Sequence, residues 1–224
     1  MYTIERQLQL CIDNVNQWAI KNGFKFSPTK TVCMHFFRKR KIHPEPRLFL
    51  GLDLIPVLEK QRFLGLIFGK RLTFKPHIQD LKIRCGKALD IIKCLSSTRW
   101  GSNCNILLYL YRTLVWSKLD YGCIVHRSAP KSYLNLLNPV HHQGIRLATG
   151  AFRSSPMESL YVEAGEPSLD HRQIKLALQF ITRIKLDPDG PVFGDVFEIT
   201  PKIQDILERY PSRTGPLGHR LKPS

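Results

Sequence analysis

The stretch that decides the fold is KQRFLGLIFGKRLTFKPHIQDLKIRCGKALDIIKCL, residues 60–95. Together with residues 47–59 it begins as short apolar segments divided by glycine and proline, which predict a β-hairpin or small meander. From Pro76 the apolar residues recur with the helical period of about 3.6, on the stripe Ile78, Leu81, Cys85, Ala88, Leu89, Ile92 and Leu95. Strands followed by an amphipathic helix indicate the α+β class, with a boundary near Phe74–Pro76.

The residues before this stretch predict one more helix and two more strands. Apolar residues at helical spacing predict an amphipathic helix over residues 3–21, which Asn22-Gly23 ends. Two β-rich segments follow and predict strands at residues 24–26 and 31–37. Residues 38–46 are charged and contain two prolines, which indicates an exposed basic loop.

The residues after the stretch predict helices. A loop at residues 100–105 offers Ser102 or Asn103 as the N-cap of the next helix. Helical spacing then predicts helices at residues 106–119, 132–147 and 170–184. Beyond Leu186 the chain is rich in proline and glycine, so we expect a tail with one short possible helix near Asp205.

The charge of the chain indicates an anionic partner. The 224 residues include 34 Lys and Arg against 18 Asp and Glu, which gives a formal net charge of +16. Residues 1–100 hold 19 of these cations and 7 of the anions, a net +12, which leaves +4 for the remainder. An excess of this size attracts polyanions, so nucleic acid is the first partner to consider.

Several other classes of protein lack support in the sequence. The six cysteines have no paired spacing and are interpreted as reduced core residues, and His141-His142 as core or surface histidines rather than zinc ligands. We find no signal-peptide layout and no apolar run of membrane length. We therefore expect an intracellular protein, in the cytoplasm, the nucleus or both, with no membrane partner.

The carboxylates of the first hundred residues are dispersed. They form no Asp-Asp or Asp-x-Asp pair and comprise Glu5, Asp13, Glu45, Asp53, Glu59, Asp80 and Asp90. Two-metal phosphoryl transfer needs clustered carboxylates that hold two ions about 3.5–4 Å apart. We therefore predict no metal site in this chain.

Three groups of motifs stand in a fixed order along the chain. They are SPTKT at residues 27–31, KQRFLGLIF at residues 60–68, and a helical region with LVWSKLDYG at residues 114–122 and QGIRLATGAFR at residues 143–153. This ordered set resembles the back half of the reverse transcriptases of non-LTR retrotransposons, most closely the jockey-like type. The resemblance extends over about residues 4–186.

The resemblance implies a polymerase architecture. Residues 1–75 would be the C-terminal part of the palm, a partial palm made of a helix, antiparallel strands and the primer-grip hairpin. Residues 76–186 would be the all-helical thumb, which in the family holds an RNA/DNA primer-template, and residues 187–224 a tail. Gly69 and His126 depart from the family pattern, which more often has Asp and Trp at these positions.

Lys30 is the candidate catalytic residue. It matches the motif D lysine of the family, which is proposed to neutralise charge or donate a proton at the pyrophosphate leaving group. The local sequence alone favours a solvated turn lysine.

The hairpin at residues 60–68 is the candidate primer grip. Gly65 would allow close approach of the primer backbone, while Lys60 and Arg62 would meet phosphates. The other interpretation is that Phe63, Leu64 and Gly65 belong to a hairpin whose alternate residues simply pack on the sheet. The two interpretations are compatible, since one face can pack while the other grips.

The helix after Pro76 carries further candidate contacts. Helical phasing predicts one basic side that carries Lys82, Arg84, Lys87, Lys93 and Arg99, where they would contact nucleic-acid phosphates without sequence readout. The run RKRK at residues 38–41 is either a nuclear-localisation or phosphate patch or a solvated turn.

The family's catalytic centre lies outside this sequence. Its two metal ions are held by aspartates that the family places upstream of the helix opening this chain. The expected function is therefore a polymerase fragment that binds primer-template and is inactive alone, with Mg²⁺ required only by the complete polymerase. The alternative is a stand-alone basic nucleic-acid-binding or interaction module derived from such an element.

Overall fold

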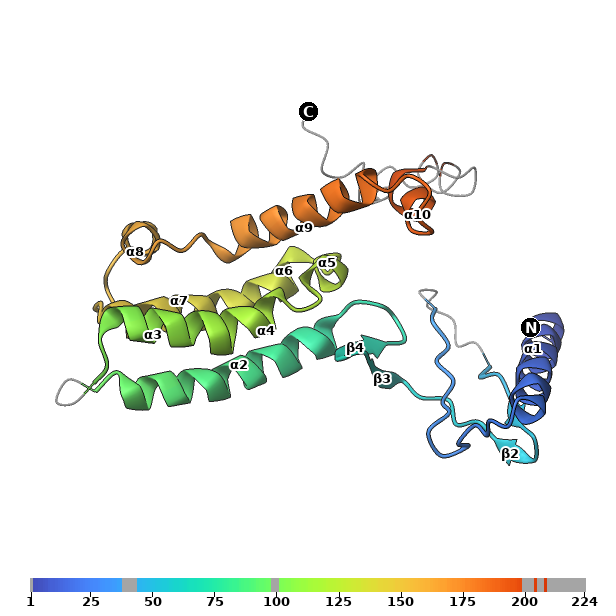
Figure 1. Ribbon diagram of the computed structural model, residues 1–224. Coiled ribbons are helices and arrows are strands. Elements are labelled where there is room, and N and C mark those ends of the chain that lie inside the picture. The colour runs from blue at the N-terminus through green and yellow to red at the C-terminus, as the bar shows by residue number, and fades with distance from the viewer. Residues whose placement is uncertain (1, 38–43, 98–100, 199–203, 205–207, 209–224) are drawn as a thin grey trace. The chain divides into compact units, whose positions relative to one another are not determined.

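The computed structural model describes residues 2–37, 44–97, 101–198, 204 and 208 (Figure 1). Two compact units share the chain: unit 1 holds Met1–Asp80 and Ala129–Tyr133, and unit 2 holds Leu81–Ser128 and Leu134–Ser224. Helices occur together with two small antiparallel sheets, which agrees with the predicted α+β class. The domain boundaries inferred from the sequence stay a prediction.

Unit 1 opens with helix α1, Tyr2–Lys21, as the sequence predicts. The helix stops where Gly23 takes the left-handed φ of +77°. Gln9 fastens α1 to the next strand, because its side chain donates to the Phe49 carbonyl at 2.9 Å and accepts from the Phe49 N–H at 2.8 Å. The apolar face of the helix is largely exposed, including Ile4, Leu8, Val15 and Trp18.

The strands of unit 1 form two short hairpins. Strands β1, Phe49–Leu50, and β2, Asp53–Leu54, pair antiparallel, as do β3, Lys60–Phe63, and β4, Leu66–Gly69. This confirms the hairpin or small meander predicted for the segment. A small core beside β1 consists of Leu48, Leu50 and Ile55, against which Ile12 and Cys33 pack.

The two strands predicted at residues 24–26 and 31–37 are wrong. Neither segment is a strand, and within them Cys33 forms an isolated parallel bridge with Val57. The Cys33 N–H donates to the Pro56 carbonyl at 2.9 Å, and its own carbonyl accepts from the Leu58 N–H at 3.0 Å. β-prone residues are not sufficient for a strand, which also needs a continuous neighbouring edge for its hydrogen bonds.

Helix α2, Lys75–Leu95, confirms the helix predicted after Pro76. Its apolar stripe is buried from Ile78 to Ile92, as the period of 3.6 requires. Helix α3, Cys104–Tyr111, follows with Asn103 as its N-cap, because the Asn103 side chain accepts from the Asn105 N–H at 3.0 Å.

Unit 2 continues as a series of helices. A π-helical segment, Arg112–Trp116, joins α3 to α4, Ser117–Asp120, and so completes the helix predicted at residues 106–119. The remaining elements are α5, Cys123–His126; α6, Lys131–Leu134, which begins in unit 1; a 3₁₀ turn, Asn135–Leu137; α7, Asn138–Thr149; α8, Met157–Ala164; α9, Leu169–Lys185; and α10, Phe193–Phe197.

The helices predicted at residues 132–147 and 170–184 are confirmed by α6–α7 and α9. Helices α8 and α10 were not predicted, since both are too short to show a clear helical period. Asp205, where a further short helix was predicted, lies outside the described residues, as do the basic run at residues 38–41 and Arg99.

A close helix contact organises the core of unit 2. Helix α3 packs along α7, as Figure 1 shows, and Tyr111 is fully buried there. A Cβ atom on Gly144 of α7 would lie 2.2 Å from Cε2 of Tyr111, which is closer than two carbon atoms can approach. Glycine at position 144 is therefore what allows the tyrosine ring to lie against the backbone of α7.

The six cysteines are free. Cys85 and Cys123 are buried and confirm the prediction of reduced core thiols, and burial raises the pKa of each to about 11. The core assignment is wrong for the exposed cysteines Cys11, Cys94 and Cys104.

Candidate nucleic-acid interface

The hairpin of β3 and β4 closes through a two-residue turn. Phe63 pairs with Leu66, which leaves Leu64 and Gly65 as the turn residues, with φ of +47° and +79°. Positive φ at both positions is the pattern of a type I′ turn, which suits the twist of a hairpin. Glycine adopts this conformation without strain, whereas for leucine it costs about 1–2 kcal/mol.

The tip of this hairpin is apolar and exposed. Phe63 is 63% exposed and Leu64 73% exposed. The core interpretation is therefore wrong for these two neighbouring residues, since neither side chain is buried. A strained leucine beside an exposed phenylalanine is a combination that folding alone does not favour, and such strain is more frequent at binding sites.

The base of the hairpin is fastened to the start of α2. Arg62 Nη2 lies 3.2 Å from Asp80 Oδ2, in a pair whose side chains are 54% and 30% exposed. The Ile67 N–H donates to Nδ1 of the buried His77 at 3.4 Å. The base of the hairpin is therefore attached to the start of α2, and the Arg62 guanidinium already has Asp80 as a partner.

Lys60 and Lys70 flank the same hairpin. Lys60 is exposed at the first position of β3, opposite Gly69. Lys70 lies 2.9 Å from Glu59, and this hydrogen bond, followed by the lysine charge, lowers the pKa of the Glu59 carboxyl. Of these two lysines, Lys60 is the one whose ammonium has greater freedom to meet a phosphate.

Lys30 is exposed in a tight turn. The Thr31 N–H donates to the Ser27 carbonyl at 3.0 Å, and the Thr31 hydroxyl donates to the same oxygen at 2.8 Å. The chain then runs past the Cys33 bridge to Phe37, whose N–H donates to the Lys70 carbonyl at 3.0 Å. The turn that carries Lys30 is therefore linked to the end of the β3–β4 hairpin by backbone contacts within unit 1.

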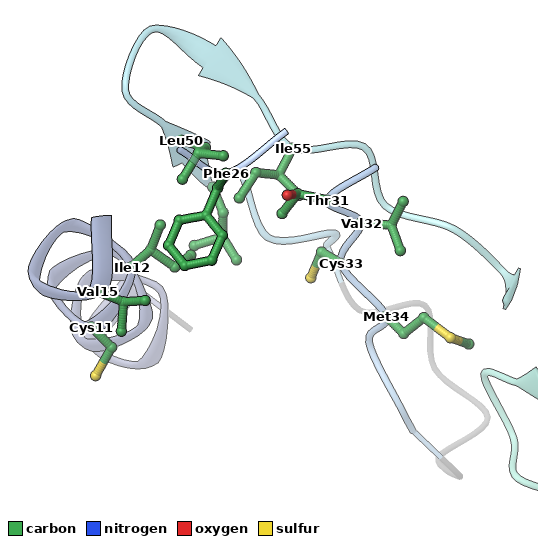
Figure 2. A pocket seen from close by; sticks show the side chains of 11 residues that line it. Cys11, Ile12, Val15, Phe26, Thr31, Val32, Cys33, Met34, Leu50 and Ile55 are labelled. Carbon is green, nitrogen blue, oxygen red and sulfur yellow. The ribbon is translucent and has the colours of Figure 1, made fainter. Parts of the chain in front are cut away.

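An apolar hollow of about 450 Å³ lies beside the segment that follows Lys30, and residues 31–34 form part of its lining. Figure 2 shows Ile12 and Val15 of α1 on one wall, with Phe26, Cys33 and Ile55 among the side chains that complete it. The lining is almost wholly hydrophobic, which excludes it as a nucleotide phosphate site.

The cations predicted on α2 do not share one side. Successive residues of an α-helix rotate by about 100°, so Lys82 and Arg84 point in directions about 200° apart. Lys82 is phased with Lys93, whereas Arg84 is phased with Lys87. The expectation of a single basic side is therefore wrong, and the cations lie on two flanks of the buried stripe.

The structure brings no metal-binding cluster together within the residues it describes. The carboxylates next to the hairpin are paired with cations instead, Asp80 with Arg62 and Glu59 with Lys70. The described residues therefore do not fit the paired Mg²⁺ ions of a complete polymerase, and no chemical step is derived through such ions. That the chain holds no metal stays a prediction.

The helical motifs of unit 2 have structural contacts. Asp120 receives a forked pair of hydrogen bonds from Arg172, at 2.7 Å from Nη2 and 3.2 Å from Nε. Gly122 and Gly150 take left-handed φ of +67° and +70°, where glycine is the residue without strain. These motif residues therefore shape unit 2.

A buried polar chain crosses the same unit. His141 Nε2 lies 3.1 Å from the Pro167 carbonyl, which can only accept, so Nε2 carries the proton and Nδ1 accepts from the Tyr111 hydroxyl at 2.5 Å. Burial, followed by the charge of His142, lowers the pKa of His141 to about 4. This confirms His141 as a core histidine, in its neutral form at pH 7.

Comparisons with known proteins point to one class. The chain is 22% identical over 208 residues to a probable RNA-directed DNA polymerase from transposon X-element of Drosophila melanogaster, which covers 93% of this chain and 20% of that protein. It is 21% identical over 183 residues to the RNA-directed DNA polymerase from mobile element jockey of the same fly, covering 82% of this chain and 20% of that protein.

A third relative comes from another insect. The Pol polyprotein from type-1 retrotransposable element R1 of Bradysia coprophila is 26% identical over 196 residues, which covers 85% of this chain and 19% of that protein. The chain resembles the polymerases of non-LTR mobile elements. The resemblance read from the motifs is thus confirmed, and this chain spans about a fifth of the length of these relatives. No protein-family model and no solved structure matches the chain.

Within the described ranges, no helix has both the length and the hydropathy that crossing a bilayer requires.

Proposed function

We propose that this chain is the primer-template-binding part of an RNA-directed DNA polymerase of a mobile element. The observation that carries the proposal is the hairpin tip, where the exposed Phe63 and the strained Leu64 stand on a support fastened by Arg62 and His77. Unit 1 would then be the last part of the palm and the helices of unit 2 the thumb.

Each candidate residue has a place in this proposal. The Gly65 backbone lets the primer strand approach, Phe63 and Leu64 contact its sugars and bases, and Lys60 meets a phosphate. Lys82, Arg84 and Lys87 add phosphate contacts from the two flanks of α2. Lys30 is the inherited lysine of the leaving-group site.

In this proposal the catalytic aspartates lie in the part of the relatives that this chain does not match, and the chain alone is inactive. A primer-extension assay with the 224-residue chain tests this directly. We expect no extension in the presence of Mg²⁺, and measurable synthesis would overturn the assignment. Fusion to the catalytic half of a related polymerase tests Lys30, since Lys30→Ala should then slow nucleotide addition.

The grip itself is tested by binding. A fluorescent RNA–DNA hybrid titrated with the chain should show affinity that falls steeply with salt, because each phosphate contact releases counterions. The double variant Phe63→Ser and Leu64→Ser should weaken binding about tenfold. Leu52→Ser is the matched control, since Leu52 is a fully exposed leucine in the turn of the other hairpin. Equal affinities for the two variants would overturn the primer-grip assignment.

A further inference from the structure

Unit 2 contains an open hollow of about 590 Å³ on helix α7 and the loop that follows it. Four polar side chains line it: His142, Gln143, Arg146 and Arg153. The first three come from α7, and Arg153 comes from the loop after the left-handed Gly150. Two guanidinium groups therefore line one depression, although their charges repel each other.

Arg146 is held in place and is incompletely satisfied. Its Nη2 donates to the Ser155 carbonyl at 3.1 Å, which fixes the side chain against the loop. Its Nε is buried and has no hydrogen-bond acceptor among the described residues. A buried donor without an acceptor is unfavourable, so an anion or an ordered water at this place would stabilise the arrangement.

His142 beside it stays neutral. The Tyr161 hydroxyl lies 3.0 Å from His142 Nε2, and burial, followed by the charge of Arg146, lowers the histidine pKa. Glu158 opposes this with a negative charge near the same ring. The positive charge of the hollow therefore comes from the two arginines, while His142 and Gln143 provide neutral hydrogen-bonding groups.

We propose that this hollow binds a phosphate group of a nucleic-acid backbone between Arg146 and Arg153. Planar guanidinium groups match phosphate oxygens with paired hydrogen bonds, and a fixed arginine loses little freedom on binding. The site deepens the proposed function and rests on it, because it adds a phosphate contact in unit 2 that is separate in sequence from the hairpin.

A neighbouring side chain favours a nucleic acid over free phosphate. Phe152, between the lining residues Ala151 and Arg153, is 82% exposed. Aromatic rings next to cationic grooves are the faces on which unpaired bases stack. A strand whose phosphate sits in the hollow would thus find an exposed ring beside it.

The test measures binding of a fluorescent single strand and of the RNA–DNA hybrid to the 224-residue chain at several salt concentrations. Arg153→Gln should weaken binding about fivefold and reduce the salt slope by about one phosphate contact. Phe152→Ser should weaken binding of the single strand about fivefold and leave the salt slope unchanged. Arg183→Gln is the matched control, since Arg183 is an exposed arginine of α9 outside this hollow.

Equal affinity and salt slope for Arg153→Gln and Arg183→Gln would overturn the proposal. This outcome differs from failure of the proposed function, which is a lack of effect of the Phe63 and Leu64 substitutions. Phosphorus NMR titration with inorganic phosphate separates the two phosphate sources. Saturable binding of free phosphate that requires Arg153, without an effect of Arg153→Gln on nucleic acid, would also overturn it.

Discussion

Large side chains are exposed at the hairpin tip of unit 1 and buried at the contact between α3 and α7 in unit 2. Phe63 and Leu64 are exposed, and Leu64 is held at a φ that a leucine rarely adopts. Tyr111 and His141 are fully buried, and their polar atoms form a continuous hydrogen-bonded chain to Pro167. The hairpin tip has a strained backbone and exposed apolar side chains. In the helix contact the large side chains are buried and their polar atoms are hydrogen-bonded.

This difference separates residues that stabilise the fold from residues available for binding. A motif residue whose contacts are all internal, such as Asp120 or Gly144, is explained by packing alone. An exposed and strained residue such as Leu64 is not. Substitutions in the two regions should therefore change stability in opposite directions.

The largest effect is expected at Gly144. In Gly144→Ala the new methyl group would meet the Tyr111 ring at 2.2 Å, so the free energy of unfolding should fall by about 3 kcal/mol. Denaturant unfolding followed by circular dichroism measures this. Gly86→Ala is the matched control, since Gly86 is also helical but has open space around it, and it should gain about 0.5–1 kcal/mol. A loss of stability at both positions would contradict the packing argument.

The next effect is pH dependence from His141. Its folded pKa of about 4 lies below the ordinary histidine pKa of 6.5, so the unfolded chain takes up a proton first as the pH falls. The stability contributed by neutral His141 is present above pH 6.5 and is lost toward pH 4. Between pH 7 and pH 5 the loss should be about 2 kcal/mol.

His141→Gln checks the source of this pH dependence. Glutamine can still donate to the Pro167 carbonyl but does not titrate, so the variant should be less stable at pH 7 and show a shallower fall toward pH 5. Urea unfolding at both pH values measures the two slopes. Identical slopes in the variant and the natural chain would assign the pH dependence to other groups.

Two ion pairs, one in each unit, should differ in their coupling free energy. Arg172 and Asp120 of unit 2 are 33% and 22% exposed and share three hydrogen bonds, so a double-mutant cycle should give a coupling of about 1 kcal/mol. Arg62 and Asp80 of unit 1 are more exposed, and their coupling should lie below about 0.5 kcal/mol. A larger coupling in unit 1 would contradict the expectation that the more exposed ion pair is the weaker one.

The change in stability expected at the hairpin tip has the opposite sign. Leu64→Gly removes the strain of the positive φ and should stabilise the hairpin by up to about 1 kcal/mol, while it weakens binding of the RNA–DNA hybrid about threefold. Leu72 also has a positive φ, of +52°, but lies beyond the hairpin. Leu72→Gly should therefore leave the affinity unchanged, and an equal loss of affinity in both variants would remove the special role of the tip.

Regular periodicity explains where the sequence analysis succeeded. Helices α1, α2 and α9 follow apolar residues at a spacing of 3.6, and the α3–α4 helix starts at the predicted N-cap Asn103. The hairpin at residues 60–69 follows from short apolar segments around Gly65. These signals lie within one segment of the sequence, so they can be recognised without knowing which other segments pack against it.

The errors arise where the outcome depends on distant partners. The segments at residues 24–26 and 31–37 have β-prone residues, but Cys33 alone of them forms a bridge. The error about the cations of α2 is local instead, because the rotation of about 100° per residue by itself separates Lys82 from Arg84. For the candidate site, the sequence indicated the hairpin and Lys30. The hollow lined by Arg146 and Arg153 could not be predicted, because it forms only where the loop after α7 folds back against that helix.

By itself, the sequence determined the helical periodicity, the hairpin, the positive charge and the resemblance to mobile-element polymerases, because each depends on residue types and their order along the chain. Only the tertiary structure decided that Leu64 is strained and exposed, that Gly144 admits the Tyr111 ring, and that Arg146 has a buried donor without an acceptor. These properties depend on which atoms meet across the fold, and a one-dimensional pattern does not contain those distances.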